Sequence, residues 1–285
     1  MLFRSQGAHG ARRVAAVQRA IVACEQCARL REHCTTVARE KRRMYRDETY
    51  WGRPVPGFGD PQARLVIIGL APGAHGANRT GRVFTGDSSG DWLYEALHRS
   101  GFASSPTSVS RDDGQRLTDC YITCAARCAP PDNKPLPGEL ERCQPFLDAE
   151  LRLLTRTRVV LALGRVGHEA WLRASGRVAG LAVRERPAFA HAAEHVFDDG
   201  LVLLSSFHPS RQNTQTGRLT RAMWHRVFER ARRLGQVECA VGIERRDHCR
   251  HDATETPGHQ NEPSAARSMP CVRMRSSCSS IHTSW

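Results

Sequence analysis

Four cysteines are the residues of this chain with the clearest chemical potential. Cys24 and Cys27 form a CEQC motif near the start, and Cys128 and Cys143 bracket the segment CAPPDNKPLPGELERC much later in the chain. A CxxC motif brings two soft sulfur ligands to one point, and a loop followed by a helical turn can deliver two more. Four thiolates at one point are typical of a metal centre, either zinc or an iron–sulfur cluster.

A second set of polar side chains follows apolar runs of the sequence. Asp87 lies in the glycine-rich loop after the run LVII, and His208 comes directly after the run LVLLSSF. Open parallel α/β sheets place their sites at the carboxyl ends of strands, so we expect these loops to converge. A carboxylate there can orient a water molecule, although capping the following helix is a common use of such an Asp. A histidine at a strand end favours a ligand contact over a structural role.

The loop after the first apolar run is rich in glycine, and glycines such as Gly73 let backbone amides approach a ligand closely. Neither GxGxxG nor a GxxxxGK motif is present, which disfavours a dinucleotide or triphosphate site. Phe84 in this loop is suited either to stack on a flat base or to pack in the core. Asn133 lies in the segment PPDNKP, where an asparagine is typical of a turn.

Short apolar runs alternate with amphipathic patterns of helical spacing, which is typical of an α/β protein with a parallel sheet covered on both faces. Strands are predicted at residues 65–68, 120–125, 159–164 and 201–207. Helices are predicted at residues 14–39, 91–100, 139–154, 165–175 and 218–234.

The same patterns predict the domain organisation. Residues 1–13 are expected to be flexible, and residues 14–236 to form one domain. Residues 237–285 lack periodicity and contain few large apolar side chains, so we expect a disordered tail. Its cysteines fit no spacing that is typical of a zinc site.

Composition bounds the partners. The formal net charge of +13 favours a polyanion such as nucleic acid, although an arginine-rich proteome would produce the same bias. The first twenty residues hold four arginines and no long apolar core, which argues against a secretory signal, and no apolar run is long enough to span a membrane. We therefore expect a reducing cytosolic setting, in which clustered cysteines more often hold metal.

Five separated strings occur in one order: CEQC, YWGRPVPGFGDP, GLAPGAHGANRTGRVFTGDSSGDWLY, RCAPPDNKP and HPSRQN. Together they resemble the family 5 uracil-DNA glycosylases, the iron–sulfur type also called type B. The resemblance covers residues 20–235 and implies a uracil-DNA glycosylase-like fold, a three-layer α/β/α sandwich with a central four-stranded parallel sheet.

The resemblance also implies roles for particular residues. It gives Asp87, Asn133 and His208 as the catalytic residues, and it assigns base binding to Gly73, Phe84, Asn133 and His208. Arg211 and Gln212 would insert into DNA. Cys24, Cys27, Cys128 and Cys143 would hold a [4Fe–4S] cluster, leaving Cys34, Cys120 and Cys124 free. Cys124 stands where the family usually has a small residue.

The implied activity is hydrolytic excision of a flipped uracil from DNA, and of other deaminated bases such as hypoxanthine, leaving an abasic site. Lys134 is the only lysine in these loops, so a Schiff-base lyase step is not expected. We expect a monomer that acts on double-stranded DNA and also on single strands in the bacterial cytosol. Arg29, Arg31 and Arg127 are expected to contact phosphates.

Two other readings account for part of the sequence. One is a non-catalytic iron–sulfur or zinc protein that binds nucleic acid. The other is an electron carrier, which would leave the glycine-rich and HPS loops without a function.

Overall fold

The computed structural model describes residues 2–236, with the side chains of residues 10–236, and it confirms the predicted parallel sheet. The sheet has the order β1-β3-β2-β4-β6-β5. Its four inner strands are parallel and wholly buried, as their unbroken apolar runs predict: β2 (Leu65–Gly69), β3 (Cys120–Cys124), β4 (Val159–Leu163) and β6 (Val202–Ser206). Two short antiparallel strands that the sequence did not predict, β1 (Phe58–Gly59) and β5 (Glu194–Val196), extend its edges.

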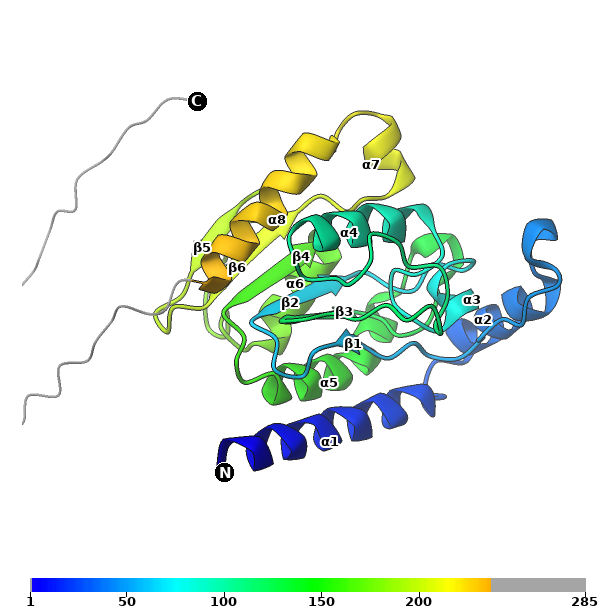
Figure 1. Ribbon diagram of the computed structural model, residues 1–285, viewed down its shortest axis with the longest axis horizontal. Coiled ribbons are helices and arrows are strands. Elements are labelled where there is room, and N and C mark those ends of the chain that lie inside the picture. Colours follow the sequence, from blue (N-terminus) through cyan, green and yellow to red (C-terminus); the bar gives the residue numbers. More distant parts are fainter. Residues whose placement is uncertain (1, 237–285) are drawn as a thin grey trace, which may run out of the picture. The chain divides into compact units, whose positions relative to one another are not determined.

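Helices cover both faces of this sheet (Figure 1), which gives the expected three layers. One layer consists of α4 (Ser88–Arg99) and α8 (Arg221–Gln236), and the other of α1 (Leu2–Val22), α5 (Pro137–Leu153) and α6 (Arg165–Ala174). Strand β2 shows how one run of residues serves both layers. Leu65 and Ile67 pack in the core beneath α4 and α8, whereas Val66 and Ile68 pack in the core beneath α5 and α6.

The N-terminal region differs from the prediction in its helices. The helix expected at residues 14–39 is two helices, α1 and α2 (Ala28–Glu40), and the CEQC motif lies between them. Helix α1 begins at Leu2 and so includes most of the segment 1–13, whose expected flexibility stays a prediction. The tail expected at residues 237–285 lies outside the described residues. Within the described part, no helix is both long and apolar enough to cross a membrane.

Candidate active site

The loops after the four parallel strands begin side by side at one edge of the sheet. Gly69 at the end of β2 lies opposite Cys124 at the end of β3, and Leu163 of β4 lies opposite Ser206 of β6. Backbone hydrogen bonds continue one residue past the strands, with Ala125 N donating to the carbonyl of Gly69 at 2.9 Å. The convergence expected from the sequence is therefore present, and this edge is the candidate site.

Phe84 lies directly over the end of β2. A Cβ atom added to Gly69 would lie 2.7 Å from two carbons of the Phe84 ring and 3.3 Å from Cys124 Sγ. Only glycine at the strand end leaves room for the ring. Phe84 is 8% exposed and its φ of 52° is in the left-handed region, which is unusual for an aromatic residue. The Phe84 ring is thus packed against the ends of β2 and β3.

His208 lies beside Phe84. Their ring centroids are 5.8 Å apart and their planes are inclined by 32°. Burial lowers the pKa of His208 to about 4, so its imidazole is neutral at physiological pH. Among residues 10–236 no protein group hydrogen-bonds to its ring, while its backbone carbonyl accepts from Asn213 Nδ2 at 2.9 Å. A neutral imidazole with a free N–H can donate a hydrogen bond to a ligand.

Asp87 serves as a helix cap and also faces the glycine-rich loop. Its Oδ1 accepts from the backbone N–H groups of Ser89, at 3.0 Å, and Gly90, at 2.9 Å, at the start of α4. Its Oδ2 would lie 1.9 Å from a Cβ added to Gly76 and 2.7 Å from one added to Gly73. Burial raises the pKa of Asp87. The capping role weighed from the sequence is therefore present, and one carboxylate oxygen is left for other contacts.

The loops of Asp87 and His208 are joined by a direct bond, because Ser89 Oγ donates to the carbonyl of Pro209 at 3.1 Å. A buried arginine that was not predicted from the sequence holds the glycine-rich loop after β2 in place. Arg79 is 8% exposed, and it donates from Nε to the carbonyl of His75 at 2.8 Å and from Nη2 to that of Gly86 at 2.9 Å. The feature of the sequence that could have indicated this role is a charged residue within a glycine-rich, apolar loop.

Three other residues expected in the site make no contact with Asp87, Phe84 or His208 within the described residues. Asn133 is exposed, at the end of a 3₁₀ turn at Pro131–Asn133, with a φ of 57°. Arg211 and Gln212 are exposed at the start of the short helix α7 (Arg211–Gln215), which Ser210 caps. Their positions leave all three free to meet a ligand that arrives from solvent.

The four cysteines expected to bind metal come together from three parts of the chain. Cys24 and Cys27 lie between α1 and α2, Cys128 follows β3, and Cys143 lies in α5. The thiols of Cys24 and Cys143 each interact electrostatically with those of Cys27 and Cys128. All four are free of disulfides.

Of the three cysteines expected to be free, one lies close to this group. The Cys34 thiol contacts the Cys128 thiol and also donates to the carbonyl of Ala129 at 3.6 Å. Cys120 and Cys124 are instead buried within β3.

The arrangement of these sulfurs bears on which metal centre they fit. Among the described residues, no three His, Cys, Asp or Glu side chains are arranged to hold one metal ion. A single zinc ion needs its four sulfurs about 3.8 Å apart, since Zn–S bonds of about 2.3 Å radiate tetrahedrally. A four-iron cluster accepts a wider spacing, because each cysteine binds a different iron. The four thiols lie close enough to interact with one another, and a donor set made only of sulfur suits either an iron–sulfur cluster or a zinc ion.

Two arginines lie against these sulfurs. Arg142 Nε donates to Cys27 Sγ at 3.3 Å, and Arg31 lies against Cys128. Burial raises the pKa of Cys143 to about 11, an effect that a bound metal cation reverses by stabilising the thiolate. Arginines at this distance would stabilise thiolates that bind a metal centre.

The expectation that Arg127 contacts phosphates is wrong. Its side chain is 1% exposed and is paired with Glu150 at 2.6 Å beneath the sheet edge. Arg31 is 11% exposed and donates to Glu25 at 3.1 Å. Arg29 is 41% exposed but forms two bonds of 2.8 Å with Glu139. These arginines connect segments that carry the cysteines. The net charge of the sequence could not reveal which residues they pair with.

Comparisons with known proteins agree with this geometry. Residues 56–232 match the model of the uracil DNA glycosylase superfamily. A type-5 uracil-DNA glycosylase of Thermus thermophilus is 51% identical over 214 residues, which cover 75% of this chain and 94% of that protein. One from Mycobacterium tuberculosis is 47% identical over 232 residues, 81% of this chain and 85% of that protein. One from Pyrobaculum aerophilum is 44% identical over 211 residues, 74% and 88% of the two chains.

Proposed function

This chain belongs to the type-5 uracil-DNA glycosylases of the uracil-DNA glycosylase superfamily, and we propose that it excises uracil from DNA by hydrolysing the N-glycosidic bond. The products are free uracil and an abasic site. The observation that carries this proposal is the pairing of Phe84 and His208 at the carboxyl edge of the sheet, with a centroid distance of 5.8 Å. The pair offers an aromatic face and a hydrogen-bond donor to one flat ligand.

The chemistry requires the base to leave the helix, at a cost of about a few kcal/mol. Phe84 stacks on one face of the flipped base. As the glycosidic bond stretches, negative charge grows on the base, and the neutral imidazole of His208 donates a hydrogen bond to a base oxygen. A fixed donor of this kind stabilises the transition state more than the ground state.

Asp87 acts on the sugar side of the bond. Its Oδ1 is engaged by the N-terminus of α4, and its Oδ2 faces the loop that carries Gly73 and Gly76. We assign to Oδ2 the orientation of the attacking water and the stabilisation of positive charge on the sugar. Gly73 supplies backbone contacts to the base, and Asn133 reaches its edge once DNA is bound. The chain has two lysines, Lys41 and Lys134, and within the described residues neither contacts Asp87, Phe84 or His208, so we expect the reaction to end at the abasic site.

The four cysteines Cys24, Cys27, Cys128 and Cys143 hold a [4Fe–4S] cluster in this proposal. The chemistry that such a cluster supplies here is four metal–thiolate bonds, which link α1, α2, α5 and the loop after β3. Arg142 and Arg31 balance its negative charge, and the segment that carries Asn133 is thereby anchored to the N-terminal helices.

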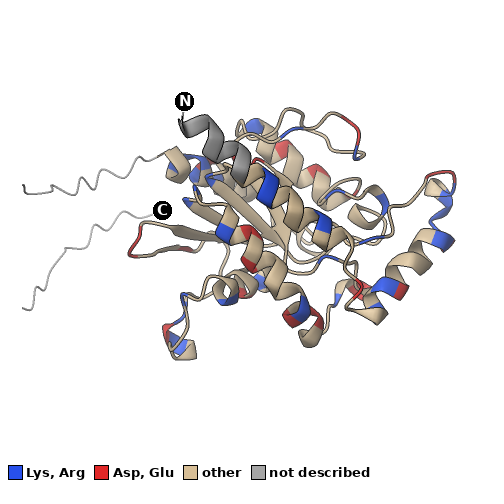
Figure 2. Cartoon of the chain, turned by 90° about the horizontal axis from the view of Figure 1, so that it is seen from below, with Lys and Arg blue, Asp and Glu red and all other residues tan. Residues whose placement is uncertain are grey.

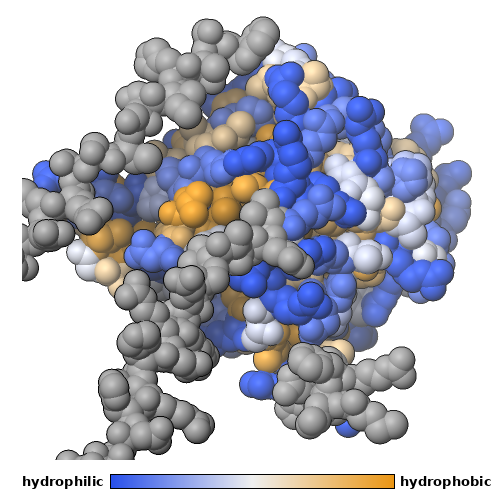
Figure 3. Space-filling model, turned by 60° about the vertical axis from the view of Figure 1, so that its left-hand side comes forward, coloured by the Kyte–Doolittle hydropathy of each residue, from blue (hydrophilic) through white to orange (hydrophobic). Residues whose placement is uncertain are grey.

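The surface is suited to DNA. The net charge is +13, Lys and Arg are spread over the helices and loops of the described part (Figure 2), and the face in Figure 3 is largely hydrophilic around a smaller apolar area. We assign Arg211 and Gln212 to the gap that the flipped base leaves.

Action on single strands, excision of hypoxanthine, a monomeric state and a cytosolic setting stay predictions. We also propose that residues 237–285 are dispensable, since the family match ends at residue 232.

A panel of labelled oligonucleotides tests this proposal. It contains uracil opposite guanine, uracil opposite adenine, single-stranded uracil, hypoxanthine opposite thymine, and a thymine control. We expect alkali-labile breaks at uracil and none at thymine. Tight binding to every uracil substrate without breaks would instead support a non-catalytic nucleic-acid-binding protein, which the family membership does not favour.

A further inference from the structure

Phe84 has a backbone conformation that needs support from its surroundings. Its φ of 52° places an aromatic residue in the left-handed region, which side chains other than Gly, Asn and Asp rarely adopt. Residues held in this way persist only when neighbouring contacts determine them, and they cluster at functional sites. The contacts that hold this segment therefore decide where the Phe84 ring lies.

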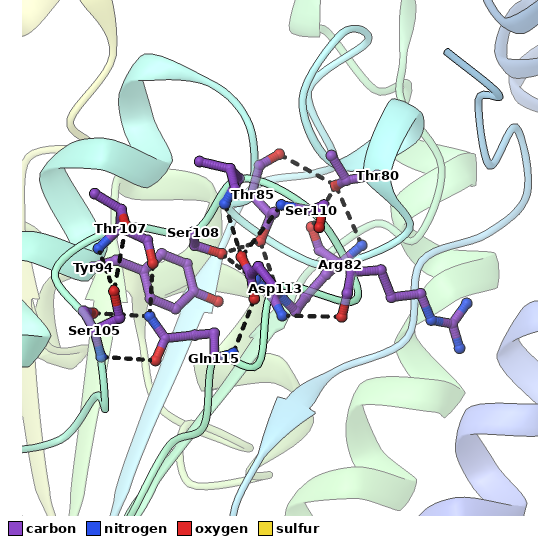
Figure 4. A network of polar contacts seen from close by, with 12 residues as sticks. Thr80, Arg82, Thr85, Tyr94, Ser105, Thr107, Ser108, Ser110, Asp113 and Gln115 are labelled. Atoms are coloured by element: carbon purple, nitrogen blue, oxygen red, sulfur yellow. Dashed lines mark hydrogen bonds and ion pairs between the residues drawn. The ribbon is translucent and has the colours of Figure 1, made fainter.

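A buried arginine fastens the residue that follows Phe84. Arg82 is 4% exposed, and its Nε donates to Thr85 Oγ1 at 3.1 Å. Its Nη2 donates to Ser108 Oγ and to Asp113 Oδ2, each at 2.6 Å, and Thr85 Oγ1 and Ser108 Oγ are 2.7 Å apart (Figure 4). These contacts connect both sides of Phe84 to one ion pair.

The same network continues along the backbone. Gly86 N donates to the carbonyl of Ser108 at 3.0 Å, and Tyr94 OH donates to the carbonyl of Val83 at 3.4 Å. Asp113 also accepts from the backbone N–H groups of Val109 at 2.9 Å and Gln115 at 2.9 Å, which fold the loop around its carboxylate. Residues 83, 85 and 86 are thus each bonded to a neighbour, on either side of Phe84.

Asp113 carries a negative charge at neutral pH. Its partial burial alone would raise the pKa, but hydrogen bonds from Arg82 and from the backbone outweigh this effect and lower the pKa of Asp113 to about 2. Asp113 itself has no place in the chemistry described above.

We propose that the Arg82–Asp113 ion pair is a positioning device that fixes the ring of Phe84 for stacking on the flipped base. This inference rests on the proposed function, because it assumes that Phe84 contacts the base. The loop that carries Ser108 and Asp113 then acts on catalysis only through Phe84, and the site is organised before DNA binds.

A double-mutant cycle tests this. Asp113→Asn should lower the single-turnover rate of uracil release about 10- to 100-fold, with the Kd for uracil-containing duplex changed less than about threefold. In a Phe84→Ala background, the same Asp113→Asn change should lower the rate less than about twofold further, because the ring it positions is gone. Asp113→Glu should restore part of the rate. Asp199→Asn, which breaks the surface pair with Arg177, is the matched control and should leave the rate unchanged.

Other outcomes overturn the inference in distinguishable ways. Wild-type protein that releases no uracil would remove the proposed function, and with it this inference. A slow Phe84→Ala protein beside a fast Asp113→Asn protein would overturn the inference alone, as would Asp113→Asn lowering the rate equally in both backgrounds. If Asp113→Asn fails to fold, Ser108→Ala removes one hydroxyl of the same network, and the same cycle with Phe84→Ala decides the matter.

Discussion

The imidazole of His208 lies beside the ring of Phe84, with centroids 5.8 Å apart, although the two residues follow strands β6 and β2, which are not neighbours in the sheet. Strand β4 lies between them, and its loop begins at Gly164, where an added Cβ would lie 3.4 Å from His208 Cβ. The short turn after β4 therefore lets the two outer loops meet over its end. This meeting forms the site in which we place the base.

Replacement of His208 by alanine should lower the single-turnover rate of uracil release by about a hundredfold, because one fixed donor to the developing anion is lost. The thermal midpoint should change little, since the ring makes no hydrogen bond to the protein within the described residues. His98→Ala, at an exposed position of α4, is the control. An excision rate equal to that of the wild type would remove His208 from the mechanism.

The pH dependence of excision should lack a histidine transition near neutrality. The pKa of His208 is lowered to about 4 by burial, so the imidazole is neutral above about pH 5, and burial also raises the pKa of Asp87. The single-turnover rate should show no transition of His208 between about pH 8 and 6, and it should fall as the pH is lowered and the Asp87 carboxylate gains a proton, because the proposed orientation of water needs the charged form. An inflection near pH 6.5 that disappears in His208→Ala would contradict this assignment.

Cys128→Ala should yield protein without the brown colour and without absorbance near about 400 nm, together with a lower thermal midpoint. Cys120→Ala is the control, because Cys120 is also buried but belongs to the start of β3. Iron analysis and thermal denaturation of both variants check the prediction. A stable Cys128→Ala protein that keeps its full iron content would refute the ligand set.

Asn133→Ala tests whether an exposed residue reaches the base in the complex. Asn133 is exposed in the free protein, but its φ of 57° is one that alanine adopts at a cost, so its replacement should lower the free energy of unfolding by about 1 kcal/mol. Uracil excision should nevertheless slow by about tenfold or more if its amide binds the base edge. The adjacent Asp132→Ala is the control, and equal rates for both variants would exclude Asn133 from the site.

The parallel sheet could be predicted because each inner strand is a continuous apolar run buried on both faces. The edge strands could not, since β1 and β5 are too short and too exposed to leave a hydrophobic pattern. The break between α1 and α2 was missed because the helical spacing of apolar residues continues across the CEQC motif. The break places Cys24 and Cys27 between the two helices, where their thiols interact with those of Cys128 and Cys143.

The site was predictable only in part. That Asp87, Phe84 and His208 lie in loops at one edge of the sheet could be expected because they follow strand ends, whereas their proposed roles come from the family resemblance and stay predictions. The contact of Arg82 with Asp113, and the burial of Arg127 against Glu150, depend on tertiary packing between segments distant in the sequence. The charge and the sequence spacing of arginines do not reveal such pairs. Arg127 was therefore wrongly expected to contact DNA phosphates.

The most direct test is the quantification of free uracil released by iron-replete protein from a duplex with a single uracil opposite guanine, under single-turnover conditions. We predict one uracil per duplex and one alkali-labile abasic site, with release slowed about a hundredfold in the parallel His208→Ala sample. Intact substrate after prolonged incubation with the wild-type protein would contradict the account.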